Sequence, residues 1–165
     1  MSNVFNPMLD LKLERVVDLT PAELWAAWTT PESIKHWFCP KPWLTPDCTI
    51  DLRLGGAFAS TMQSPEGQIF LNIGCYLEII PHNKLVWTNS LAPDFRPRQT
   101  DTAANPCDFS MTVILEFIPH ERGTKYRAIV LHATEKDRET HAGMGFAEGW
   151  GIVLDQMVAH VKALR

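Results

Sequence analysis

The sequence lacks the patterns that identify common cofactor, metal and hydrolase sites. It contains no GxGxxG, GxxxxGK[ST] or GxSxG segment, the usual signatures of dinucleotide binding, phosphate binding and serine hydrolysis. Its six histidines form no HxH or HxxxH pair, so we expect no metal site. The four cysteines form no CxxC pair, which favours reduced thiols in a cytoplasmic protein without a cofactor.

Basic charge and long hydrophobic runs are also scarce. With 15 basic and 19 acidic residues the net charge is −4, which argues against nucleic acid and anionic membranes as partners. No stretch approaches the roughly 20 apolar residues of a spanning helix. The start, MSNVFNPMLDLKLERV, has no basic region before an apolar run, so we expect no secretory signal. A hydrophobic content of 45% in 165 residues favours one soluble domain over 1–165.

The most frequent pattern in the sequence is an alternation of apolar and polar residues, which is typical of β-strands. Residues 9–19 alternate and predict a half-buried strand, followed by helix starts at Thr20-Pro21 and Thr30-Pro31. In residues 69–80 we expect every second side chain to face inward, beginning with Ile69 and ending with Ile79. Further strands are predicted in 49–54, 57–62, 85–90, 109–117 and 125–133. The segment 91–108 shows no periodicity and is predicted to be a long loop, either a functional lid or a plain connection.

The chain ends in a predicted helical region of roughly 25 residues, a length within the range of helices. Its apolar stripe begins at Trp150, yet the segment 143–151 carries four glycines, each of which costs about 1 kcal/mol inside a helix. We expect these glycines to allow a close approach of the helix to another surface, or a bend. Tight packing of the helix on the sheet is the simpler explanation.

This order of elements predicts an α+β fold. Two short helices follow the first strand, and a curved antiparallel sheet of six to seven strands surrounds the long C-terminal helix. A helix is only about 10 Å wide, so it cannot cover such a sheet completely. An apolar hollow between helix and sheet is therefore the expected place for a small hydrophobic ligand.

Aromatic and long apolar side chains on the inward faces are the candidate walls of this hollow. Trp25 and Trp28 are expected to pack between the short helices and the rest of the protein. The residues predicted to contact a ligand are Trp37, Phe58, Trp87, Phe109, Met111, His132, Phe146, Trp150, Leu154 and Met157.

Few polar side chains fall on the inward faces. Arg15 lies in the apolar row of the first strand, where it needs an acceptor such as Asp51 or Glu78. Arg15 and Glu78 are therefore candidate polar anchors, with a structural ion pair as the alternative. His132 is inward by alternation and is either a core histidine or a proton-transfer group. His141 is expected at the cavity mouth or on a solvated helix face.

Several segments together resemble a known family. LERVVDLTPAELWAAWTTPESIKHWF is similar to the opening of the START and birch-pollen-allergen superfamily (SRPBCC), in the branch of the activator of heat-shock-protein-90 ATPase. The residues that carry this likeness are Arg15, Thr20, Pro21, Trp25, Thr29, Pro31 and Trp37. DLRLGG, GCYLEIIPHNKLVWT and MGFAEGWGIVLDQM resemble later segments of the same branch.

The resemblance implies a helix-grip fold with a cavity between sheet and helix. It also implies one of three functions. The first is binding of a small hydrophobic or aromatic molecule without catalysis, and this is the function we expect. The second is a cyclase or hydrolyase acting on a polyketide-like substrate in the same cavity, with His132, Glu78 or Arg15 as the acid or base. The third is a co-chaperone-like interaction module. A homodimer is a further partner state that the sequence leaves open.

Overall fold

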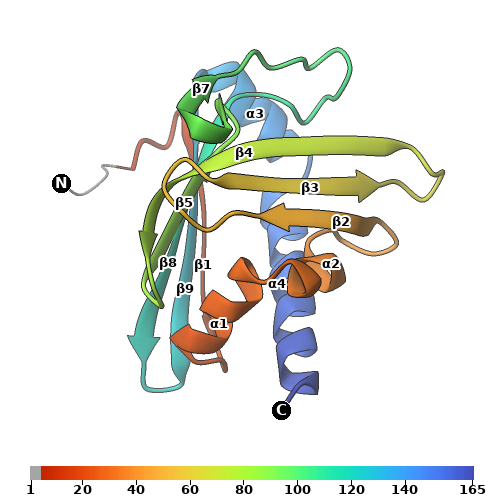
Figure 1. The fold of residues 1–165 in the computed structure, drawn as a ribbon. Coiled ribbons are helices and arrows are strands. Elements are labelled where there is room, and N and C mark those ends of the chain that lie inside the picture. Colours follow the sequence, from red (N-terminus) through yellow and green to blue (C-terminus); the bar gives the residue numbers. More distant parts are fainter. Residues whose placement is uncertain (1–4) are drawn as a thin grey trace.

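A curved antiparallel sheet packed against a C-terminal helix forms the framework of the protein. The computed structural model describes residues 5–165 (Figure 1). The main sheet contains β1 (Asp10–Val17), β2 (Leu44–Ile50), β3 (Ala57–Gln63), β4 (Ile69–Ile80), β5 (Lys84–Thr88), β8 (Met111–His120) and β9 (Gly123–His132). The helices are α1 (Pro21–Thr29), α2 (Pro31–Trp37), α3 (Glu135–Gly143) and α4 (Phe146–Ala163). A small hairpin consists of β6 (Leu91–Ala92), the 3-10 turn η1 (Pro93–Phe95) and β7 (Arg96–Pro97).

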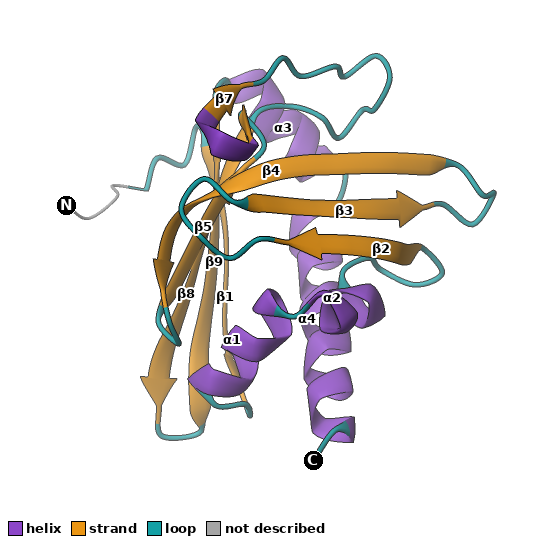
Figure 2. Cartoon of the chain, in the orientation of Figure 1, coloured by secondary structure: helices purple, strands orange, loops and turns teal. Residues whose placement is uncertain are grey.

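The first strand, β1, forms one edge of the main sheet and pairs with the last strand, β9. The strand order is β1-β9-β8-β5-β4-β3-β2, and neighbouring strands are antiparallel. In Figure 2, β2, β3 and β4 run across the view while β1, β8 and β9 run down it, so the sheet bends strongly. The helices α1 and α2 lie beside the long helix α4. The predicted α+β helix-grip fold is therefore confirmed.

Local sequence signals account for the short helices. The hydroxyl of Thr20 accepts a hydrogen bond from the Glu23 amide at 3.1 Å, and the Glu23 carboxylate accepts one from the Thr20 amide at 3.0 Å. This capping box satisfies two amides that the first turn of a helix leaves without partners. The Arg165 guanidinium also binds Glu23, and this contact is the main reason that the Glu23 pKa falls to about 2. The end of the chain is thus joined to the start of α1.

The predicted facing of β4 is wrong over its first half. Ile69, Leu71 and Ile73 are 51%, 63% and 41% exposed, so the row that they form points outward. The reason is a bulge: the pairing of β4 with β5 shifts register between Tyr76 and Glu78. One extra residue reverses the alternation. Residues with even numbers face inward before the bulge, whereas those with odd numbers, such as Ile79, face inward after it.

The second strand lies earlier in the chain than its prediction. The observed β2 begins at Leu44, inside the proline-containing segment predicted to be a connector, and it ends at Ile50. Leu52 and Leu54 follow it in a turn and are 41% and 57% exposed. A side chain at Gly56 would meet the Asp51 carbonyl oxygen at 1.9 Å, so this turn folds back on itself too closely for any other residue.

The predicted C-terminal helical region is split in two. Gly145 has a φ of 83°, a left-handed conformation that ends α3 and allows α4 to begin at Phe146, before the predicted start at Trp150. Gly151 has a different function, which is to allow close packing. A Cβ atom at this position would lie 2.8 Å from the Arg15 guanidinium, so the glycine lets α4 approach β1. Gly145 and Gly151 therefore serve the two expected purposes, a break in the helix and close packing.

Candidate functional site

A cavity of about 250 Å³ lies between the sheet, α4, the short helices and the loop before β8. Its lining combines aromatic rings with a few polar groups. The aromatic rings of the lining are Trp28, Phe38, Phe58, Trp87, Phe109, Tyr126, Phe146 and Trp150. The polar side chains are Ser60, Asn72, Asn89, Asp108 and His141. A mostly apolar hollow with a few polar groups is the usual form of a small-molecule site.

The Phe58 ring stands at the centre of one wall. Its centroid lies 4.9 Å from Trp87, 5.8 Å from Tyr76 and 5.8 Å from Phe38. Trp28 completes this group at 6.4 Å. Stacked contacts such as Phe58–Tyr76 and edge contacts such as the other three each contribute about 0.5–1.5 kcal/mol beyond area burial and fix the rings in place. This wall is therefore held in place by contacts among the protein's own rings.

Much of the predicted ligand-binding set belongs to this lining. The predicted residues that line the cavity are Phe58, Trp87, Phe109, Met111, Phe146 and Trp150. They come from β3, β5, the β8 end of the sheet and the start of α4. The structure thus brings together side chains from distant parts of the sequence, as the inward faces of the strands and the helix predicted.

Four residues of the predicted set lie outside the lining of this cavity. Trp37 is fully buried among Trp28 and Phe38, and its indole N–H donates to Ser33 at 3.1 Å. Leu154 and Met157, 1% and 0% exposed, continue the stripe of α4 into the core. His132 lies behind His141. Helical and strand periodicity identify a buried face, but they do not say how far along that face the cavity extends.

The predicted polar anchors are surface residues. Arg15 pairs with Asp155 at 2.6 Å, and the two side chains are 39% and 70% exposed. Its partner is thus neither Asp51 nor Glu78, because α4, which carries Asp155, lies against β1 at Arg15. Glu78 pairs with Lys84 at 3.0 Å and is 43% exposed. Exposed pairs of this kind contribute little to stability, and neither side chain reaches the cavity.

The structure adds lining residues that the sequence did not identify. Trp28 was expected only to pack the short helices, yet it also lines the cavity. Asn72 was placed on the outer face of β4 by the missed bulge. Asn89 falls in the predicted strand 85–90 on the same side as Trp87 but was not among the predicted site residues, and in the structure it follows β5. The amide nitrogen of Asn72 and the indole nitrogen of Trp87 are buried without an acceptor among residues 5–165.

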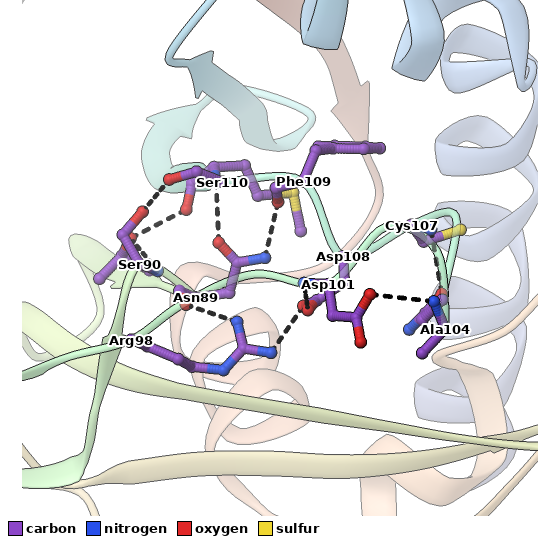
Figure 3. A network of polar contacts seen from close by, with 12 residues as sticks. Asn89, Ser90, Arg98, Asp101, Ala104, Cys107, Asp108, Phe109 and Ser110 are labelled. Atoms are coloured by element: carbon purple, nitrogen blue, oxygen red, sulfur yellow. Dashed lines mark hydrogen bonds and ion pairs between the residues drawn. The ribbon is translucent and has the colours of Figure 1, made fainter.

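A polar network holds the loop that closes one side of the cavity (Figure 3). The Asn89 side chain donates to the Phe109 carbonyl at 2.8 Å and accepts from the Met111 amide at 2.8 Å. Arg98 donates to the Asn89 carbonyl and to the Asp108 carboxylate, at 3.0 and 2.7 Å. The Arg98 and Asp108 side chains are only 19% and 12% exposed. A largely desolvated pair is costly to break, so the loop is fastened to the sheet.

Two histidines pack against the Phe109 ring, next to this loop. His132 Nδ1 lies 2.8 Å from the Leu9 carbonyl oxygen, and His132 Nε2 lies 2.9 Å from His141 Nδ1. We call these two residues the histidine pair. Burial lowers the pKa of His141 to about 4, and the nearby charge of His132 adds to the effect. Burial also lowers the pKa of His132, although the Leu9 carbonyl opposes this.

The histidine pair should make the protein less stable in mild acid. In the unfolded chain His141 binds its proton near the ordinary pKa of 6.5, whereas in the folded protein it does so near 4. Between these values the unfolded state binds more protons, so stability is present above pH 6.5 and falls as the pH is lowered. Between pH 7 and 5 the expected loss from His141 is about 2 kcal/mol.

Denaturant unfolding at a series of pH values measures this loss. His132 faces Asp10, Asp137 and Arg138, whose charges partly offset one another. The lowered pKa of Glu23 affects stability mainly below pH 4.5. The change in stability between pH 7 and 5 therefore does not include the effect of Glu23. His141→Phe should flatten most of the slope. A variant that kept the entire slope would show that other groups cause it.

The described residues provide no other centre that suggests chemistry. Among residues 5–165 no group of three or more histidine, cysteine or acidic side chains is placed to hold a metal ion. Within the same residues no helix is both long and apolar enough to cross a membrane. The free thiols of Cys39 and Cys48 are buried, and burial raises their pKa values. Thiols of this kind are poor nucleophiles.

The fold and the cavity define an α+β helix-grip protein with an internal site. A family model described as "Activator of Hsp90 ATPase homolog 1-like protein" matches residues 18–162. The chain belongs to this family, within the SRPBCC superfamily, as the sequence resemblance predicted.

Solved structures agree with this assignment. A protein from Nitrosomonas europaea is 39% identical, with 96% of this chain and 97% of that chain covered and a TM-score of 0.89. A protein from Rhodobacter sphaeroides is 22% identical, with 97% of each chain covered and a TM-score of 0.80. An AHSA1-like protein from Aeromonas hydrophila is 20% identical, with 94% of each chain covered and a TM-score of 0.68. The last two show the fold alone. No curated protein sequence matches the chain.

Proposed function

We propose that the protein binds a small hydrophobic or aromatic molecule in the cavity and does not change it chemically. The observation that carries this proposal is the cavity of about 250 Å³, with walls made mostly of aromatic rings. A well-packed core leaves few voids larger than a water molecule. The rings around Phe58 contact one another closely, so the remaining space is not the result of loose packing.

The size of the cavity sets the size of the ligand. An apolar cavity of about 150 Å³ is enough for benzene, so this space suits one or two fused rings. Such a ligand buries about 200 Å² of its surface, which is worth about 5 kcal/mol at 25 cal/mol per Å². Losses of motion on binding offset part of this gain, so we expect dissociation constants of about 0.2 mM or weaker.

The cyclase or hydrolyase alternative has weaker support. It required an acid or base in the cavity, and the candidates were His132, Glu78 and Arg15. Glu78 and Arg15 form ion pairs at the surface, and His132 is separated from the cavity by His141. Binding therefore agrees better with the positions of these groups. No observation on the described surface favours the chaperone-interaction alternative.

Nuclear magnetic resonance can test the proposed binding directly. Naphthalene titrated into the ¹⁵N-labelled protein should cause saturable shifts at the indole N–H groups of Trp87 and Trp150, and at the amide of Gly74. The indole N–H of Trp25 lies outside the lining and should move little, which provides an internal control. Shifts spread evenly over the surface, or none at saturating naphthalene, would contradict the proposal.

A further inference from the structure

The hydrogen bonds of the histidine pair determine which ring nitrogens carry protons. A backbone carbonyl oxygen can only accept, so His132 Nδ1, at 2.8 Å from the Leu9 oxygen, carries a proton and donates it. A neutral imidazole has one N–H, and His132 Nε2 is therefore an acceptor. His141 Nδ1 lies 2.9 Å from that acceptor, so His141 Nδ1 must be the donor. The remaining nitrogen, His141 Nε2, is left without a proton.

Both imidazoles are neutral near pH 7. Burial lowers both pKa values, and a positive charge on either ring opposes protonation of the other. The charged groups near His132 are Asp10, Asp137 and Arg138. The charges of these three groups do not reverse the lowering of the His132 pKa. The chain of donors and acceptors derived for two neutral rings is therefore the one that applies at physiological pH.

Aromatic packing fixes the direction of the His141 ring. Its centroid lies 4.9 Å from Phe109, 5.1 Å from Phe146 and 6.3 Å from Trp150. All of these rings, and His141 itself, line the cavity. Residues 5–165 provide no hydrogen-bond partner for His141 Nε2. The ring can neither rotate away nor satisfy this nitrogen within the described part of the chain.

We infer that His141 Nε2 is a fixed hydrogen-bond acceptor for the ligand, and that the ligand is a flat apolar ring compound bearing a neutral hydroxyl group, such as a phenol or an enol. The inference rests on the proposed binding function and specifies its ligand. His132 does not touch the ligand. It acts as a positioning residue, because its bond to Leu9 keeps the proton of His141 on Nδ1.

The charges around the cavity exclude the main alternative, an anionic ligand such as a fatty acid. A carboxylate has no proton to donate to His141 Nε2. Among the described residues, the lining contains no lysine or arginine, and the nearby Arg98 guanidinium is already paired with the Asp108 carboxylate at 2.7 Å. An anion would thus enter a desolvated space without a cation, which is unfavourable. A neutral hydroxyl group meets an acceptor and brings no charge.

Matched naphthalene derivatives test the ligand class by isothermal titration calorimetry at pH 7.5. The protein should bind 2-naphthol about tenfold more tightly than 2-methoxynaphthalene, whose oxygen cannot donate, because one hydrogen bond is made or lost. It should bind 2-naphthoate more weakly than either. His141→Phe should remove the preference for 2-naphthol over 2-methoxynaphthalene, a ratio that is measured within the variant itself. Equal affinities of the unmodified protein for 2-naphthol and 2-methoxynaphthalene would overturn the inference but leave the binding function intact.

Ring-nitrogen NMR of the ligand-free protein tests the role of His132 independently. Both histidines should show a protonated Nδ1 and a bare Nε2. His132→Phe should give a mixture of His141 tautomers and a weaker preference for 2-naphthol, with naphthalene affinity unchanged. His132→Gln supplies a side-chain amide acceptor near the position of Nε2 and should restore both properties, which a merely structural effect would not.

The outcomes separate the two proposals. If His141 carries its proton on Nε2 in the unmodified protein, the inferred acceptor does not exist, whatever binds in the cavity. If neither naphthalene nor 2-naphthol binds at all, the proposed function fails, and the assignment of the ligand fails with it. Saturable binding with a hydroxyl preference that depends on His141 supports both.

Discussion

Replacing Phe58 with alanine should lower the free energy of unfolding by about 3–5 kcal/mol, the usual cost of deleting a buried phenylalanine ring. Phe58 is 5% exposed and contacts Trp87 and Tyr76, with centroids 4.9 and 5.8 Å away. Its removal eliminates these contacts and joins the vacated volume to the existing cavity. The rigid framework of the bent sheet cannot close this space, so the loss should lie near the upper end of the range.

Denaturant unfolding measures this effect, and benzene provides a specific check. Benzene should raise the midpoint of the Phe58→Ala variant more than that of the unmodified protein, because it can refill the deleted ring volume and binds only the folded state. Phe58→Leu is the matched control, since it keeps most of the apolar volume and should cost clearly less. A loss below about 1 kcal/mol for Phe58→Ala would mean that the wall collapses readily and that the cavity is not a fixed feature.

The parts of the fold that were predicted correctly are those where a local rule and the tertiary environment agree. Thr20 and Glu23 form a capping box because their spacing in the sequence is sufficient to bring the groups together. The inward row of β8, including Val113 and Leu115, follows simple alternation. The family resemblance adds the arrangement of these elements, which no local pattern contains.

The errors occur where one residue changes the environment of many others. The bulge after Tyr76 reverses the facing of the first half of β4, and the hydrophobic side chains Ile69, Leu71 and Ile73 conceal it because they resemble an inward row. A bulge is a property of the pairing of two strands, so one strand alone does not reveal it. The same error hid Asn72, which lines the cavity.

The site was only partly predictable for a related reason. Aromatic residues such as Phe58 and Trp87 could be found because cavity walls and cores use the same inward positions. Trp37 and Met157 occupy equally inward positions but belong to the core. Of the histidine pair, His132 was a predicted ligand-binding residue, whereas His141 was expected only at the cavity mouth or on a solvated helix face. Alternation identified His132, but only the packing of α3 against the sheet places His141 between His132 and the cavity.

Gly149 explains why a glycine occurs within the first turns of α4, and it provides the second large expected effect. Phe146, Gly149, Trp150 and Val153 follow one another at helical spacing and all line the cavity. A Cβ atom at Gly149 would meet no atom within 4 Å. Close packing therefore does not require this glycine. It leaves open space on the face of the helix that borders the cavity.

Gly149→Leu should abolish ligand binding without unfolding the protein. A leucine side chain fits the open space, fills part of the cavity of about 250 Å³ and removes a helix-weakening glycine. We expect affinity for naphthalene to fall at least about 100-fold, because a closely packed wall accommodates overlap poorly. The free energy of unfolding should stay the same or rise. Calorimetric titration and denaturant unfolding of the same preparations measure the two quantities.

Two glycine substitutions separate a blocked cavity from other effects of a larger side chain. Gly149→Ala should raise the free energy of unfolding by about 0.5–1 kcal/mol through helix propensity alone, with only a modest loss of affinity. Gly143→Leu introduces the same side chain at a position that is also free of neighbours within 4 Å but lies outside the lining, so affinity should not change. If Gly149→Leu binds naphthalene as tightly as Gly143→Leu, the ligand occupies some other place, because a site bordered by this face of α4 cannot hold both the leucine and the ring.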